Sequence, residues 1–97
     1  MDVRIQAIHF EISGKLTDFI NKKIERIARR NPAITDAEIT LKVVKPETAL
    51  NKDVTIVVKV PQRDDVVATK VADTFEEGVD LALEAIDRQL EKFKEKK

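Results

Sequence analysis

The apolar residues of this 97-residue chain change their spacing several times, and the order of these changes constrains the fold more than any other feature. Residues 3–7 alternate between apolar and polar, which is typical of a strand with one buried face. Residues 15–30 have helical spacing, with four apolar side chains on one face: Leu16, Ile20, Ile24 and Ile27. Three more strand-like segments follow, at residues 38–43, 53–60 and 66–71. Residues 75–93 return to helical spacing, so the predicted order is strand, helix, three strands, helix.

Local signals set the ends of the two predicted helices. Ser13 is a suitable N-cap for the first helix, and Asn31-Pro32 stops it because proline disfavours α geometry in the preceding residue. Asp73-Thr74, followed by Glu76-Glu77, supplies overlapping capping-box signals for the second helix. The apolar stripe of the second helix consists of Phe75, Val79, Ala82, Ile86, Leu90 and Phe93. Each helix therefore has one face to bury.

These elements fit a single domain spanning residues 1–97, because the chain is too short for two independent cores. Residues 38–43 and 53–60 are predicted to form an antiparallel hairpin with one buried face and one wet face. Both helices should cover the same face of a four-stranded sheet. We therefore predict an α+β fold of order β-α-β-β-β-α. The open face of the sheet should carry Thr40, Lys42, Thr55 and Lys59.

The composition excludes several classes of function. The chain has no cysteine, so disulfides and cysteine-ligated zinc are ruled out, and a lone His9 cannot build a multi-histidine metal site. Gly14 and Gly78 are too few for a glycine-rich phosphate loop. No apolar run approaches the roughly 20 residues that span a bilayer, and the N-terminus has no signal-peptide pattern. We therefore expect a cytoplasmic protein with no metal site and no membrane partner.

The charged residues are unevenly distributed although the net charge is zero, with 18 basic and 18 acidic residues. Residues 15–30 contain six basic and two acidic residues, and residues 88–97 contain five basic and two acidic ones. Residues 73–87, in contrast, contain six acidic residues and no basic one. An anionic partner must therefore be recognised through the distribution of charge and not through its sum.

On a helical wheel at about 100° per residue, the six basic residues of the first helix lie within an arc of roughly 120° beside the apolar stripe. In the second helix, Arg88, Lys92 and Lys96 repeat every four residues beside an acidic band. The band consists of Glu77, Asp80, Glu84, Asp87, Glu91 and Glu95. Each charged face taken alone is also explained as an ordinary solvated surface, with Glu84 and Arg88 as a local helix support. Because both helices pack on one sheet face, we expect their basic edges to merge into one cationic surface whose extent the acidic band limits.

Four stretches carry a family resemblance. The first is Phe10-Glu11-Ile12-Ser13, which leads into Leu16, Phe19, Lys22, Lys23 and Arg26. The others are Ala37-Glu38-Ile39-Thr40-Leu41-Lys42-Val43-Val44-Lys45, Ala72-Asp73-Thr74-Phe75-Glu76-Glu77-Gly78-Val79-Asp80 and Asp87-Arg88-Gln89-Leu90-Glu91-Lys92-Phe93-Lys94. Their order and spacing cover nearly the whole chain. Together they resemble the short-form, sigma-54 modulation protein-like members of the ribosome hibernation promoting factor / protein Y family. The run Arg88-Gln89-Leu90-x-Lys92-x-Lys94 is the most specific of these features.

The resemblance implies a fold similar to double-stranded RNA-binding domains and a role without catalysis or a cofactor. It also implies binding to the small ribosomal subunit in the channel for messenger and transfer RNA, which stops translation in stressed or stationary cells. The implied partners are the ribosome and the ribosomal RNA of its small subunit, with a monomer off the ribosome. Lysine and arginine suit such a channel because they bind phosphates without reading a base sequence. The RNA-binding residues expected by position are Lys22, Lys23, Arg26, Arg29, Arg30, Arg88, Lys92 and Lys96.

Two positions depart from the family pattern, since Ala85 stands where a lysine is usual and Ala7 where a glycine is usual. Ala85 lies on the Arg88 side of its helix, so one expected phosphate contact is missing. Phe19, inside the basic arc, is expected to pack between the helices, with stacking on a base as the alternative. The alternative function is a protein–protein interaction module that uses the open sheet face or an edge strand. A small-molecule enzyme ranks third, because no pocket of convergent polar groups is indicated.

Overall fold

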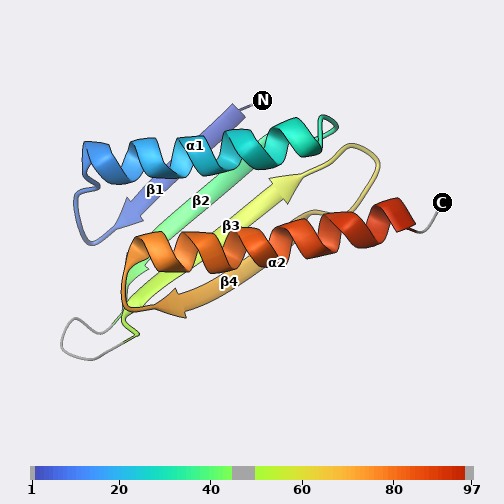
Figure 1. The fold of residues 1–97 in the computed structure, drawn as a ribbon. Helices are drawn as coiled ribbons and strands as arrows, with labels where there is room; N and C mark the ends of the chain where they lie inside the picture. The colour runs from blue at the N-terminus through green and yellow to red at the C-terminus, as the bar shows by residue number, and fades with distance from the viewer. Residues whose placement is uncertain (1, 45–49, 96–97) are drawn as a thin grey trace.

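The computed structural model describes residues 2–44 and 50–95, and these residues form four strands and two helices. In chain order the elements are β1 (Asp2–Ile8), α1 (Gly14–Arg30), β2 (Asp36–Val43), β3 (Lys52–Lys59), β4 (Val66–Ala72) and α2 (Phe75–Glu95), as labelled in Figure 1. The predicted order β-α-β-β-β-α is confirmed. The predicted ends differ from the observed ends by one or two residues, which is the usual uncertainty of element boundaries.

The sheet has the strand order β1-β2-β3-β4, so each strand pairs with its neighbour in the chain. β1 is parallel to β2, and the other two pairs are antiparallel. A parallel pair needs a crossover connection, and α1 supplies it. The predicted antiparallel pairing of the central strands is confirmed, with Ile39 opposite Ile56.

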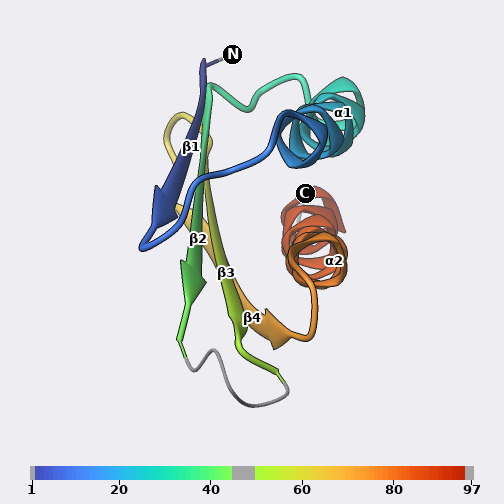
Figure 2. The ribbon, with the colours of Figure 1, turned by 90° about the vertical axis from the view of Figure 1, so that its left-hand side faces the viewer.

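Both helices lie on the same face of the sheet, and Figure 2 shows the other face open. The inward side chains of β2 and β3, such as Ile39 and Ile56, are buried. The four stripe residues of α1 are also buried, as are those of α2 up to Leu90, whereas Phe93 lies outside the described side chains. The two helices and the inner sheet face therefore share one core, as predicted.

Side-chain caps begin both helices at the expected places. The backbone N–H of Leu16 donates to Ser13 Oγ at 3.1 Å, and the N–H of Glu77 donates to Thr74 Oγ1 at 3.1 Å. Such caps typically contribute about 1 kcal/mol each, because they satisfy donors that the first helical turn leaves unpaired. The capping contact of α2 comes from Thr74, since Asp73 Oδ1 instead accepts the backbone N–H of Leu50 at 2.7 Å.

Gly78 permits α2 to approach the sheet closely. A Cβ atom at this position would lie 2.7 Å from Cγ2 of the fully buried Val54, closer than real contacts allow. At the same end of the helix, the Phe10 and Phe75 rings stack with centroids 4.7 Å apart. These contacts fix the first turns of α2 against β3 and against the segment that precedes α1, and so set the position of α2 beside α1.

Candidate nucleic-acid interface

The basic residues predicted on α1 divide into two groups according to their contacts. Lys23 and Arg30 form ion pairs with α2. Lys22, Arg26 and Arg29 are exposed, and none of the three forms an ion pair with another described residue. Their spacing of four and then three residues places them along one ridge of the helix. We call these three residues the outer strip of α1.

Two ion pairs join α1 to α2 along a common seam. Lys23 Nζ lies 3.1 Å from Oδ1 of Asp80, and Arg30 Nη1 lies 3.3 Å from Oδ2 of Asp87. On each helix the second partner follows the first by two turns, so both pairs lie on the same side. Lys23 Nζ is also 5.3 Å from the centre of the Phe19 ring, which is half-buried against the core. Phe19 therefore packs against the core, and Lys23, which is paired with Asp80, lies over its ring.

A shallow groove runs along this seam and carries both signs of charge. Its walls are Lys23, Arg26, Ile27 and Arg30 of α1 and Asp80, Leu83, Glu84 and Asp87 of α2. The predicted merging of the two basic edges into one cationic surface is therefore wrong, because three carboxylates interrupt it. Helical periodicity places each side chain around its own helix, but it does not show that the acidic side of α2 turns toward α1. We call this feature the interhelix groove.

Arg88 and Lys92 form a second group of basic residues, which we call the α2 strip. Arg88 Nη2 lies 2.7 Å from Oε1 of Glu84 one turn earlier, so the predicted local support is confirmed. Gln89 Nε2 donates to the carbonyl oxygen of Val67 at 3.1 Å, which places that side of α2 toward β4. At about 100° per residue, Arg88 and Lys92 fall between Glu84 and Gln89 around the helix. Around α2, the carboxylates therefore lie between α1 on one side and the α2 strip on the other.

Two further predicted positions bear on the α2 strip. Ala85 is half-buried and packs against the core, so the side of α2 that carries the strip has a methyl group at this position. Lys96 lies outside the described residues. The described residues thus place two basic strips on either side of a groove of mixed charge, and Arg26 of the outer strip also lines that groove.

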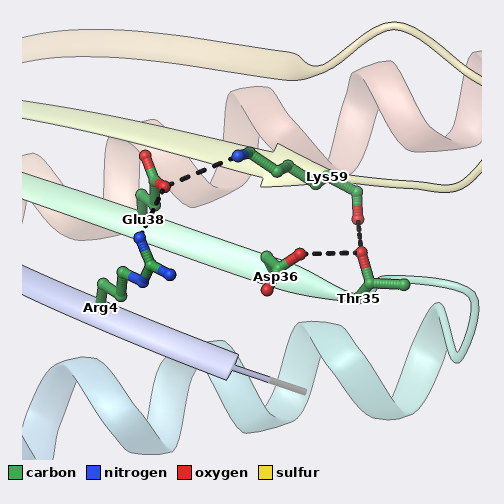
Figure 3. A network of polar contacts seen from close by, with 5 residues as sticks. All are labelled: Arg4, Thr35, Asp36, Glu38 and Lys59. Carbon is green, nitrogen blue, oxygen red and sulfur yellow. Dashed lines mark hydrogen bonds and ion pairs between the residues drawn. The ribbon is translucent and has the colours of Figure 1, made fainter.

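The open sheet face, which is the alternative binding surface, carries charges of both signs side by side. Glu38 Oε1 lies 3.8 Å from Arg4 Nη1 and 3.7 Å from Lys59 Nζ, as Figure 3 shows. At the β4 edge of this face, Val67 and Val71 are 47% and 43% exposed. Opposite charges that neutralise each other offer little attraction to a polyanion.

Neither a metal site nor a membrane span is found among the described residues. Within residues 2–44 and 50–95, no group of three histidine, cysteine, aspartate or glutamate side chains could hold a metal ion. In the same part of the chain, neither helix is sufficiently long and apolar to cross a bilayer. Side-chain nitrogen and oxygen atoms that are buried in these residues all have hydrogen-bond partners.

The chain matches the family described as sigma 54 modulation protein / S30EA ribosomal protein over residues 3–97, and it belongs to this family. It is 30% identical over 96 residues to a ribosome hibernation promoting factor from Pseudomonas putida, a match that covers 99% of this chain and 89% of that protein. A ribosome hibernation promoting factor from Azotobacter vinelandii is 29% identical over 96 residues, covering 99% of this chain and 85% of that protein. The predicted family is therefore confirmed.

Solved structures show the same fold. A ribosomal subunit interface protein from Coxiella burnetii superposes with a TM-score of 0.86 at 28% identity, covering 97% of this chain and 98% of that one. The N-terminal domain of protein Y from Thermus thermophilus superposes with a TM-score of 0.79 at 19% identity, covering 96% of this chain and 99% of that one. The order of strands and helices and the one-sided placement of the helices are thus those of a known architecture.

Proposed function

We propose that this chain is a ribosome hibernation factor that binds the small ribosomal subunit in the channel for messenger and transfer RNA. Its family and its relatives named as hibernation promoting factors support this proposal. The bound domain stops translation in stressed or stationary cells because it occupies space that the two RNAs need. No bond is made or broken in this process, and no cofactor takes part. The factor acts in the cytoplasm and is a monomer when it is off the ribosome.

The outer strip of α1 is the structural observation that carries the proposal. Lys22, Arg26 and Arg29 are exposed and form no ion pairs with other described residues. Like charges at this spacing on a helix destabilise it by about 0.2–0.5 kcal/mol per pair, so the strip does not serve the stability of the free protein. Bound phosphates would relieve this repulsion, and each arginine could hold one through two parallel hydrogen bonds.

The α2 strip supplies a second contact with RNA. The Arg88 side chain is 73% exposed, and its ion pair with Glu84 is solvated, so it contributes only about 0–1 kcal/mol. A phosphate can therefore replace Glu84 as the partner of Arg88 at little cost, while Lys92 binds a neighbouring phosphate. Lys23 and Arg30 have a smaller share in the proposed interface, because each of their ion pairs has a sheltered partner: Lys23 itself is 32% exposed, and Asp87, which binds Arg30, is 25% exposed.

A protein–protein interaction module on the open sheet face is the second candidate. The exposed Val67 and Val71 at the β4 edge favour it, since apolar side chains of this kind can pack against a protein partner. This function requires the sheet face and not the basic strips. Charge reversal on the two surfaces therefore separates the candidates.

Co-sedimentation with purified small ribosomal subunits over a series of salt concentrations tests the proposal. The wild-type chain should bind and should weaken steeply as salt rises. Arg26→Glu/Arg29→Glu should lower the affinity by about 100-fold or more, because two phosphate contacts become repulsive. The control Arg4→Glu/Lys59→Glu changes the charge equally on the sheet face and should shift the affinity by less than about fivefold. Binding that survives the α1 reversal but is lost in the sheet-face variant would support the second candidate instead.

A further inference from the structure

A phosphate that approached Lys23 or Arg30 would meet a carboxylate already bound there. The two ion pairs, Lys23–Asp80 and Arg30–Asp87, lie at successive points along the interhelix groove. In each pair one side chain is sheltered, Lys23 at 32% and Asp87 at 25% exposed, while Asp80 at 53% and Arg30 at 61% face solvent, so salt screens the pairs in part. The two carboxylates therefore offset the charges of Lys23 and Arg30 for an anion outside the groove.

The packing of the two helices does not depend on these ion pairs alone. Ile27 and Leu83 line the same groove from opposite helices and are both buried, so apolar contact already joins α1 to α2. Ion pairs between partly exposed groups add little to stability. The larger consequence of Asp80 and Asp87 is electrostatic, since they place negative charge between the outer strip of α1 and the α2 strip.

We propose that Asp80 and Asp87 are specificity-determining residues of the RNA interface, an inference that rests on the proposed function. Their negative charge prevents a single RNA backbone from binding along the interhelix groove. The domain then binds tightly only to RNA that presents phosphates to the outer strip of α1 and to the α2 strip at the same time. Folded ribosomal RNA, in which several backbone segments converge, meets this condition, whereas an unstructured single strand presents one backbone.

Neutral residues at these two positions would change the surface in a defined way. Lys23, Arg26 and Arg30 would then outnumber Glu84, the one carboxylate left among the residues that line the groove, and the groove would carry net positive charge beside the outer strip. A single strand could follow such a groove, because sequence-independent binding depends on the number of phosphates that the protein neutralises. The carboxylates thus limit capture by the unstructured RNA that any cell contains.

The test compares Asp80→Asn/Asp87→Asn with the control Asp2→Asn/Asp53→Asn, which changes the charge equally on the opposite face of the sheet. Fluorescence anisotropy measures binding of each protein to a labelled oligouridine of about 12 nucleotides at several salt concentrations, a length near the site size of single-strand binders. The groove variant should bind oligouridine at least about tenfold more tightly than wild type. Its plot of log affinity against log salt should be steeper by about 1.4, for two additional phosphates on a single strand. The control should stay within about threefold of wild type.

Equal oligouridine affinities for the groove variant and its control would overturn the specificity role. Asp80→Asn and Asp87→Asn as single variants should each give part of the effect, so the comparison holds even if the double variant loses its fold. Sedimentation with small subunits, done in parallel, tests the proposed function separately. A wild-type chain that fails to bind subunits would refute that function, while the oligouridine comparison would still decide whether the carboxylates exclude single strands.

Discussion

Lys23 of α1 and Asp80 of α2 form a direct ion pair with 3.1 Å between Nζ and Oδ1, and the same nitrogen lies 5.3 Å from the centre of the Phe19 ring. Lys22, one residue earlier, points about 100° away around the helix and forms no ion pair with any described residue. Two adjacent lysines thus have the same chemistry and different surroundings. Lys22 can bind a phosphate directly, whereas Lys23 must first leave the Asp80 carboxylate and the Phe19 ring.

Replacing each of these lysines with methionine should therefore have different effects on RNA binding. Lys22→Met should lower the affinity for small ribosomal subunits by about three- to tenfold and should reduce the slope of log affinity against log salt by about 0.7–0.9, because one phosphate contact is lost. Lys23→Met removes the same charge but should leave the slope unchanged. Salt-series sedimentation measures both variants, and an equal loss of slope in the two would contradict the division of α1 into an outer strip and a groove.

Adding a cation at Ala85 should strengthen the interface. Ala85 is half-buried beside the α2 strip, and the stem of a lysine there can cover apolar surface while its ammonium group reaches solvent. Ala85→Lys should raise the affinity for small subunits by about three- to tenfold. The slope of log affinity against log salt should become steeper by the amount expected for one additional phosphate contact. Gln6→Lys, which adds the same charge on the open sheet face, is the matched control. An equal gain in both variants would show that net charge and not position is responsible.

Gly78 should be intolerant of a side chain although it lies in a helix. Alanine is a better helix former than glycine by about 1 kcal/mol, but its Cβ would meet the buried Val54 at 2.7 Å. Overpacking of a well-packed core costs about 1–3 kcal/mol, so after the gain in helix propensity Gly78→Ala should lower the free energy of unfolding by up to about 2 kcal/mol. In Gly14→Ala, the new Cβ would have no heavy atom within 4 Å apart from its chain neighbours and the backbone of its own helix. This change should therefore be near neutral. Urea unfolding of both variants measures the difference, and a Gly78→Ala protein that is more stable than wild type by the full helix-propensity gain of about 1 kcal/mol would refute this account of the close approach.

Local patterns in the sequence were sufficient to predict the elements and their order. The alternation through Ile39 and Ile56 and the stripe through Ile20 and Ile24 each follow from the geometry of one strand or one helix. The Ser13 cap likewise depends on residues within one turn. Each of these features concerns neighbours in the chain, so a single sequence contains the information.

The relation between the two helices could not be predicted in the same way. The charge of Asp80 and Asp87 was visible, but their pairing with Lys23 and Arg30 depends on how α2 is rotated about its axis against α1. That rotation is set by long-range contacts, among them the close approach at Gly78. A helical wheel describes one helix at a time and therefore suggested a continuous cationic surface where the structure has a groove of mixed charge.

Competition with messenger and transfer RNA tests the central claim most directly. Small subunits are incubated with a short messenger and its cognate transfer RNA, and binding of the labelled chain is compared with binding to empty subunits. If the chain occupies the RNA channel, the affinity for programmed subunits should fall by about tenfold or more, and excess chain should in turn prevent transfer RNA from binding. Equal affinity for empty and programmed subunits would contradict the claim that this domain silences the ribosome by filling its channel.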